Sequence, residues 1–146
     1  MKLIPQRPSA VAGDVAPAHS PAEMAILIKR AYEPAARADG IRVLIDRLWP
    51  RGVKKVDAKF TFWMKDIAPS AKLRVWFGHK PERFKEFAGR YKKELTGNPR
   101  VAELRNLARG RTVTLVYAAR DPEVNHAVVL QTVLRRRSSS RSAIRG

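Results

Sequence analysis

The strongest constraint on the fold is a short apolar segment, residues 43–45 (Val-Leu-Ile), that turns directly into a charged loop. Three apolar residues in succession, without polar alternation, predict a strand over residues 41–45 that is buried on both faces. Burial on both faces is typical of parallel sheets, because crossover helices cover them. The following loop carries Pro50 and Gly52, which stop regular structure. The segment therefore predicts a parallel strand that leads into a surface loop.

Further strands and helices alternate along the chain. Residues 25–29 and 112–118 predict two more strands, the second rich in β-branched residues. Helical spacing of apolar residues, together with capping residues, predicts helices between the strands. They run from Ser70 to Gly78, from Pro81 to Gly97, from Asn98 to Gly110, and from an N-cap at Asp121, with Pro122 in the first turn, to the arginines at 135–137. This order predicts a compact α/β domain with a small, mostly parallel sheet flanked by helices.

The 146 residues predict one folded domain with an extension at each end. Residues 1–23 are rich in Ala and Pro without any periodicity and are predicted to be disordered. The domain is expected over residues 24–136, and Met24 is a candidate alternative start. Residues 137–146 form a basic, Ser-rich segment that is also predicted to be disordered.

Several function classes are excluded by composition. The chain has no cysteine, so disulfides, thiolate chemistry and cysteine-ligated zinc are excluded. Only three histidines are present, without metal-ligand spacing, and no Gly-rich cofactor loop follows a strand, so neither a metal nor a cofactor is predicted. No stretch is long and apolar enough for a membrane helix or a signal peptide, so we expect a soluble cytoplasmic protein without a membrane partner.

The net charge of +17 is concentrated in the predicted domain. Residues 1–23 are neutral, residues 135–146 contribute +5, and residues 24–134 retain +12 from 23 basic and 11 acidic side chains. Such a surface attracts anions over a Debye length of about 8–10 Å. Two kinds of partner therefore stay open: a small anionic ligand, and nucleic acid bound nonspecifically through the basic surface and tail.

The predicted topology places a candidate site beyond the strand ends. Parallel strands end at the same edge of a sheet, where ligands bind in α/β proteins, so residues 46–52 and 117–121 should share that edge. Arg47, Arg51 and Arg120 are the predicted ligands of a phosphate or carboxylate, because guanidinium groups bind such anions with paired hydrogen bonds. Asp46 and His79 are the candidate proton-transfer residues if the protein is an enzyme, which the sequence does not decide.

Further residues are predicted to contact the same ligand. They lie in the loop after the second strand and around the start of the last helix, whose N-terminus favours anions. They are Trp49, Tyr117, Asp121, Asn125 and His126. Two alternative interpretations stay open: the charged residues form an internal salt-bridge network that pins the loops together, or the aromatic residues 60–63 are the contact surface of a noncatalytic interaction protein.

Four segments resemble one known family. They are residues 46–52 (Asp-Arg-Leu-Trp-Pro-Arg-Gly), residues 63–70, residues 73–79 and residues 117–121. Over residues 25–134 the chain resembles the YeaO-like branch of domain-of-unknown-function family 488. The resemblance implies a compact bacterial or archaeal α/β protein without an assigned activity, substrate or cofactor.

The chain also departs from that family pattern. Lys80 stands where relatives often have Asp, which removes a helix N-cap and adds positive charge beside His79. Residues 124–126 (Val-Asn-His) stand where the YeaO-like pattern reads His-Asn-Asn. A second branch of the family has Cys there and at the position of Tyr117, so this cysteine-free chain cannot share any cysteine-based chemistry.

Overall fold

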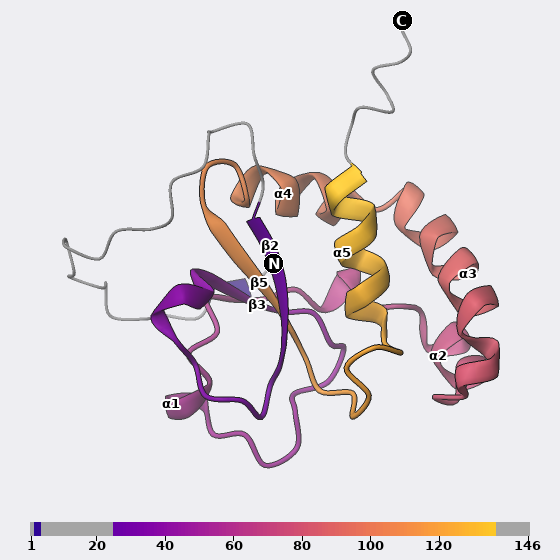
Figure 1. Cartoon of the computed structure of the whole chain (residues 1–146), viewed down its shortest axis with the longest axis horizontal. Coiled ribbons are helices and arrows are strands. Elements are labelled where there is room, and N and C mark those ends of the chain that lie inside the picture. Colours follow the sequence, from indigo (N-terminus) through magenta and orange to yellow (C-terminus); the bar gives the residue numbers. More distant parts are fainter. Residues whose placement is uncertain (1, 4–24, 137–146) are drawn as a thin grey trace, which may run out of the picture.

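The computed structural model describes residues 2–3 and 25–136, and its centre is a five-stranded sheet (Figure 1). Four strands are parallel to one another and lie in the order β4-β3-β5-β2. They are β2 (Ala25–Arg30), β3 (Ile41–Leu44), β4 (Phe62–Trp63) and β5 (Thr112–Tyr117). A two-residue strand, β1 (Lys2–Leu3), pairs antiparallel with β4 at one edge. The predicted α/β fold with a mostly parallel sheet is confirmed.

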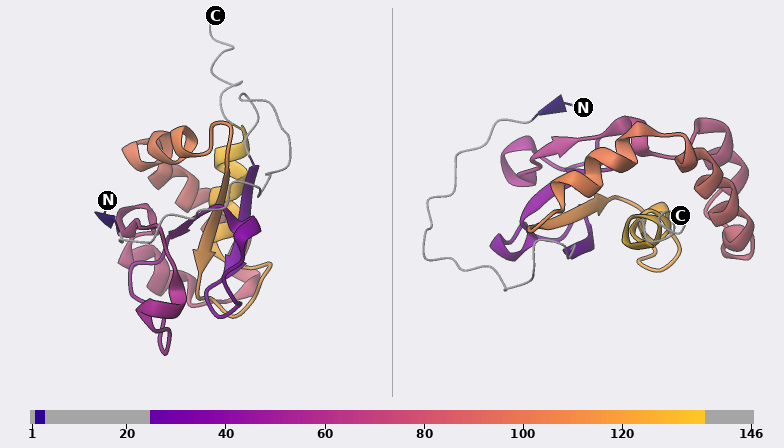
Figure 2. Two further views of the ribbon diagram at one scale, coloured as in Figure 1. Left: turned by 90° about the vertical axis from the view of Figure 1, so that its left-hand side faces the viewer. Right: turned by 90° about the horizontal axis from the view of Figure 1, so that it is seen from above.

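The longer helices pack together on one face of the sheet (Figure 2). They are α2 (Ala71–Phe77), α3 (Phe84–Thr96), α4 (Pro99–Leu107) and α5 (His126–Arg136). Helix α5 contacts β2 and β5, and α3 and α4 pack against α5. The short helix α1 (Lys55–Ala58) and three 3-10 turns, η1 (Arg37–Asp39), η2 (Lys65–Ile67) and η3 (Pro81–Arg83), complete the connections.

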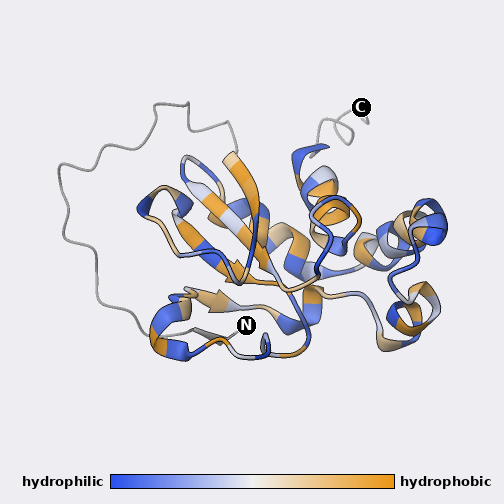
Figure 3. Ribbon diagram, turned by 60° about the horizontal axis from the view of Figure 1, so that its bottom comes forward, coloured by the Kyte–Doolittle hydropathy of each residue, from blue (hydrophilic) through white to orange (hydrophobic). Residues whose placement is uncertain are grey.

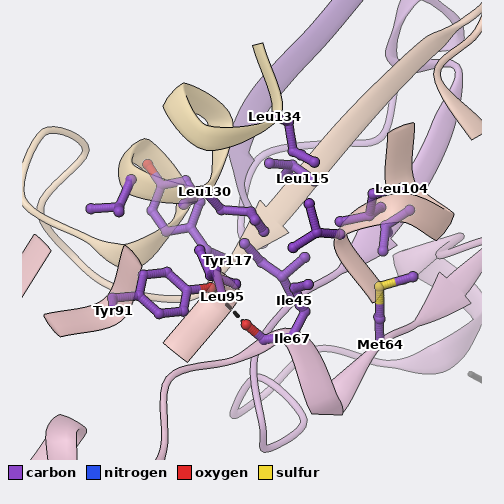
Figure 4. Close-up of a cluster of buried hydrophobic side chains, with 14 of the residues drawn as sticks. Ile45, Met64, Ile67, Tyr91, Leu95, Leu104, Leu115, Tyr117, Leu130 and Leu134 are labelled. Carbon is purple, nitrogen blue, oxygen red and sulfur yellow. Dashed lines mark hydrogen bonds between the residues drawn. The ribbon is translucent and has the colours of Figure 1, made fainter. Parts of the chain in front are cut away.

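The strand β3 is buried on both faces, as its apolar run predicts. Val43 and Ile45 point into the main core beneath the helices, whereas Leu44 points into a smaller cluster on the opposite face. Figure 3 shows the resulting concentration of hydrophobic residues along the strands. In the main core, the buried hydroxyl of Tyr91 donates a hydrogen bond of 2.6 Å to the carbonyl oxygen of Ile67 (Figure 4). Fully burying a Leu or Ile side chain, such as Leu44 or Ile45, contributes about 1.5–3 kcal/mol to the stability of the fold.

The aromatic residues 60–63 are part of the fold rather than a contact surface. Phe60 is fully buried in the smaller cluster, where its ring lies 5.3 Å from the ring of Trp49. Phe62 and Trp63 form β4 and are half-buried. The interpretation of this segment as an exposed interaction patch is therefore wrong, because its aromatic side chains complete the second face of the sheet.

Two of the predicted helix starts have the expected caps, but the last helix begins later than predicted. Ser70 accepts a hydrogen bond of 3.1 Å from the Leu73 N–H, and Asn98 caps α4 in the same way. Asp121 instead accepts bonds from the N–H groups of Glu123 and Val124, which closes a nonhelical turn. The cap of α5 is Asn125 instead.

Asn125 accepts a hydrogen bond of 3.0 Å from the Val128 N–H, in the first turn of α5. Asp and Asn have the same capping chemistry, so the sequence did not distinguish Asp121 from Asn125. The predicted cap at Asp121, with Pro122 in the first turn, is therefore wrong by one turn.

The strand β1 was not predicted, because residues 1–23 carry no strand period. Lys2 and Leu3 pair with Trp63 and Phe62 of β4. The other residues of the predicted N-terminal extension, Met24 and the predicted tail at 137–146 lie outside the described residues. At the opposite edge, the side chains of Gln131 and Arg135 on α5 donate hydrogen bonds of 2.7 and 3.0 Å to the Ile26 carbonyl oxygen of β2.

A buried ion cluster lies on the second face of the sheet. The carboxylate of Asp39 lies 3.0 Å from the Lys29 ammonium and 2.7 Å from the Arg42 guanidinium, and it accepts the Ala36 N–H at 2.9 Å. Burial by itself raises the pKa of Asp39. The hydrogen bond from Ala36 and the two cations outweigh that effect and lower its pKa below 3.8.

We predict that Asp39→Asn lowers the free energy of unfolding by about 3 kcal/mol at pH 7, because it leaves two buried cations without their carboxylate. Since the folded pKa lies below the ordinary value of 3.8, the contribution is complete above that pH and is lost as the pH falls through the folded pKa. Urea unfolding of both proteins at several pH values measures the difference. Glu123→Gln, which removes an exposed carboxylate, should change stability by less than about 0.5 kcal/mol at any of these pH values. An equal loss in both variants would contradict the role of Asp39.

Candidate functional site

A cavity of about 580 Å³ opens beyond the carboxyl ends of β3 and β5. This is the edge of the sheet where the parallel topology predicts a ligand site. Seven of the ten predicted site residues line it: Asp46, Arg47, Trp49, Arg51, His79, Asn125 and His126. The remaining three, Tyr117, Arg120 and Asp121, lie elsewhere.

Asp46 joins the three elements that meet at the floor of this cavity. It follows β3, its Oδ2 accepts the N–H of Ala118 at 3.0 Å, and its Oδ1 lies 3.1 Å from Nε2 of His126. Ala118 directly follows β5, and His126 is the first residue of α5. One carboxylate therefore holds the ends of two parallel strands and the start of a helix together.

The imidazole of His126 has a defined orientation. Its Nε2 lies 3.1 Å from the carbonyl oxygen of Ile45, which can only accept, so Nε2 carries a proton. That proton is directed at Ile45, and the buried Oδ1 of Asp46 makes no hydrogen bond to any residue in the described part of the chain. The contact between Asp46 and His126 is therefore electrostatic and orients the ring at the cavity wall.

Arg47 fastens the loop after β3 to the segment before α2. Its Nη2 donates to the carbonyl oxygens of Pro69 at 3.2 Å and Ala68 at 3.4 Å. Its buried Nε has no hydrogen-bond partner among the described residues. Arg47 thus presents a fixed positive charge to the cavity.

Trp49 and Arg51 contribute to the cavity in different ways. The indole N–H of Trp49 donates to the Val53 carbonyl at 2.6 Å, and its ring packs edge-on against Trp63 at 5.4 Å, so this side chain is part of the smaller core cluster as well as the cavity wall. Arg51 is exposed, and its carbonyl oxygen accepts the hydroxyl of Tyr32 at 3.0 Å. Arg51 thus lines the cavity as an exposed residue.

Arg120 and Asp121 line a second cavity of about 730 Å³ that adjoins the first. The sequence had placed them opposite Arg47 and Arg51 in a single pocket, which is not what the structure shows. The two cavities share four lining residues: Tyr32, His79, Ala118 and Ala119. His79 is exposed and has a left-handed backbone (φ 57°) after Gly78 (φ 53°). His79 therefore lies between the two cavities, away from the Asp46–His126 pair.

Tyr117 is a core residue rather than a ligand contact. It is 2% exposed, belongs to the main hydrophobic cluster and lines neither of these two cavities. Burial raises the pKa of its hydroxyl, and the side chain of Asn125 partly opposes this increase. The prediction failed because the side chain at the last position of β5 points to the helix-covered face, into the core.

The alternative of an internal salt-bridge network is supported for Asp46, which contacts His126 across two loops, but not for the arginines. Within the described residues, no ion pair joins Asp46 or Asp121 to Arg47, Arg51 or Arg120. The carboxylate of Asp46 instead lies 3.1 Å from Nε2 of His126. The arginines of the site are therefore not neutralised by the two carboxylates that the sequence placed beside them.

Several residues of the cavities were not predicted. They are Arg30 and Tyr32 after β2, Leu48 in the loop, Arg74 and Phe77 on α2, and Phe87 on α3. The same strand-end argument could have identified Arg30 and Tyr32, because β2 ends at the same edge. No sequence signal shows which side of α2 and α3 faces the cavity.

Within the described ranges, no group of three His, Asp or Glu residues lies close enough together to bind a metal ion. None of the helices described there has the length and apolar character of a membrane-spanning segment.

Comparison with known proteins identifies the family. A family model described as "Inactive DUF488-N3 subclade" matches residues 25–144. The chain belongs to the DUF488 family. It is 46% identical over 112 residues to the uncharacterized protein Rv3073c of Mycobacterium tuberculosis, covering 77% of this chain and 95% of that protein. It is 41% identical over 113 residues to the uncharacterized protein YeaO of Escherichia coli, covering 77% of this chain and 98% of that protein. No solved structure matches.

The candidate residues Asp46, Arg47 and His126 of this DUF488 domain thus have defined contacts, and His126 is the first residue of α5. We predict that Asn125→Ala lowers the free energy of unfolding by about 1–3 kcal/mol, because it removes a helix cap and leaves buried partners unsatisfied. Asp121→Ala, in the exposed turn, should cost only about 0.5 kcal/mol. Thermal or urea unfolding measures both. A larger loss for Asp121→Ala would restore the predicted helix start.

Proposed function

We propose that this DUF488 protein binds a small phosphorylated or carboxylated ligand in the strand-end cavity and does not turn it over. The observation that carries the proposal is the imbalance of charge around that cavity. Arg47, Arg51 and Arg74 line it, whereas Asp46 is the one carboxylate there and is already engaged by Ala118 and His126. Excess positive charge in a concave, partly apolar site attracts and concentrates anions.

The arginines are suited to different parts of the binding event. Arg47 is held by two backbone carbonyls, so its charge is preorganised. Arg51 and Arg74 are exposed at the mouth and can turn their planar guanidinium groups toward a carboxylate or phosphate. A fixed cation inside and adaptable cations outside are a reasonable arrangement for capturing a soluble anion.

A binding role agrees with the local chemistry better than catalysis does. Asp46 has a structural role, because its Oδ2 accepts the Ala118 N–H and its Oδ1 lies 3.1 Å from Nε2 of His126. His79 lies exposed at the edge of the cavity, with Phe77 as its ring contact. The family description "inactive" supports the same conclusion. Proton-transfer roles for Asp46 and His79 stay predictions.

We predict that Arg51→Ala weakens binding of inorganic phosphate by about tenfold, because one charge-assisted contact is lost. Stability should change by less than about 0.5 kcal/mol, since the variant keeps the backbone carbonyl that accepts the Tyr32 hydroxyl. Titration followed by NMR measures affinity, and urea unfolding measures stability. Arg111→Ala, which removes an exposed arginine far from the cavity lining, is the matched control. Phosphate that binds equally well to both variants would contradict the proposal.

Nucleic-acid binding is a second candidate, favoured by the surface charge. Residues 25–136 contain 25 Lys and Arg against 11 Asp and Glu, and α3 exposes Lys85 and Lys93. This function predicts that affinity for a DNA duplex falls by orders of magnitude between about 50 and 200 mM salt. It also predicts weaker binding after deletion of residues 137–146. Filter binding across this salt range measures both, and a flat titration would eliminate this candidate.

A further inference from the structure

We propose that the ligand is an amphipathic anion whose apolar body lies against the wall of the main cavity and whose acid group lies where that cavity meets the adjoining one, so that arginines of both cavities bind it. The inference rests on the proposed function and specifies the chemical class of its ligand. Three features support it: the apolar wall of the first cavity, the unneutralised arginines of the second, and the small residues between them.

The main cavity has more apolar surface than an inorganic anion could use. Trp49, Pro50, Phe77 and Phe87 form much of its wall, and Leu48 projects at its mouth with 68% of its surface exposed. The ring of Tyr32, 47% exposed, lies beside the same opening. A free phosphate would leave these side chains in water, whereas an aromatic or branched body would cover them.

The second cavity adds two further arginines that can bind the acid group. The Nε–H of Arg30 donates to the Ala119 carbonyl at 2.9 Å, and its guanidinium lies 5.1 Å from the centre of the Tyr32 ring. These two contacts fix the plane of the guanidinium, and its terminal nitrogens make no hydrogen bond to the described residues. Arg120 adds a second, exposed guanidinium to the same cavity.

The carboxylate of Asp121 would repel an anion in the second cavity, but hydrogen bonds partly offset its negative charge. Asp121 lines the second cavity, but its Oδ1 already accepts the N–H groups of Glu123 and Val124 at 2.8 and 3.1 Å. Two guanidinium groups and the imidazole of His79 therefore face one carboxylate that is hydrogen-bonded to its own turn. The balance of charge favours an acid group.

The passage between the cavities is lined by small side chains. Ala118 and Ala119, which follow β5, are shared by both cavities together with Tyr32 and His79. A methyl group at each of these two positions leaves room for a linking bond of the ligand.

The test compares three probes on the full chain by isothermal titration calorimetry: 1-naphthyl phosphate, inorganic phosphate and 1-naphthol. We expect 1-naphthyl phosphate to bind at least about tenfold more tightly than either of the other two, because it alone combines an apolar body with an acid group. Equal affinity for 1-naphthyl phosphate and inorganic phosphate would overturn the amphipathic ligand and leave the anion site intact. Equal affinity for 1-naphthyl phosphate and 1-naphthol, or no binding of any probe, would overturn the anion site as well.

Two variants test the placement of the two halves of the ligand. Leu48→Ser should weaken 1-naphthyl phosphate several-fold and leave inorganic phosphate unchanged, whereas Val56→Ser, at a residue 75% exposed outside the cavities, should change neither. Arg120→Ala should weaken both phosphates, with Arg109→Ala as the control at another exposed arginine. If Arg120→Ala has no effect while Arg51→Ala weakens 1-naphthyl phosphate, the acid group lies in the main cavity and the two-cavity placement is wrong.

Discussion

The architecture around the site depends on the carboxylate of Asp46. Two parallel strands can end side by side while the loops that follow them remain free to take different positions relative to each other. The contacts of Asp46 with the Ala118 N–H and with His126 fix these positions, because they join the loop after β3, the loop after β5 and the first residue of α5. Arg47 connects this arrangement to the segment before α2, because its guanidinium donates a hydrogen bond to the Pro69 carbonyl oxygen. Adjacent residues of one short stretch thus locate the helices that wall the cavity.

This arrangement explains why the site is rigid at its floor and adaptable at its mouth. The floor groups are tied to backbone atoms, which move little in a packed domain. Leu48 and Arg51 lie further along the same loop, and their side chains are exposed. A binding protein gains affinity from a preorganised interior, since less conformational freedom is lost there on association.

Much of the fold could be predicted from sequence, because local physical chemistry and burial agree. The consecutive apolar residues of β3 correctly indicated a strand buried on both faces, and Ser70 and Gly78 marked both ends of α2. The start of α5 could not be chosen, because Asp121 and Asn125 are equally good caps and only tertiary contacts distinguish them. β1 carried no pattern because a two-residue strand depends on its partner β4.

The site was predictable to the extent that it follows from strand direction. Parallel pairing brought Asp46 and Ala118 together at one edge, as expected. The division into two cavities was not predictable, since it depends on where His79 lies after the left-handed turn at Gly78. Tyr117 was misplaced for a simpler reason: alternate strand residues face opposite sides, and its side faces the core.

The covering of both sheet edges also affects how copies of this protein meet one another. An uncovered edge strand offers unpaired backbone groups to any passing strand and can begin aggregation. Here β1 occupies the edge of β4, and Gln131 and Arg135 occupy the Ile26 carbonyl on β2. A highly cationic chain already repels its own copies at long range, and these contacts hinder strand-to-strand pairing at short range. β1 near the start of the chain and α5 at its close thus each occupy backbone groups at one edge of the sheet.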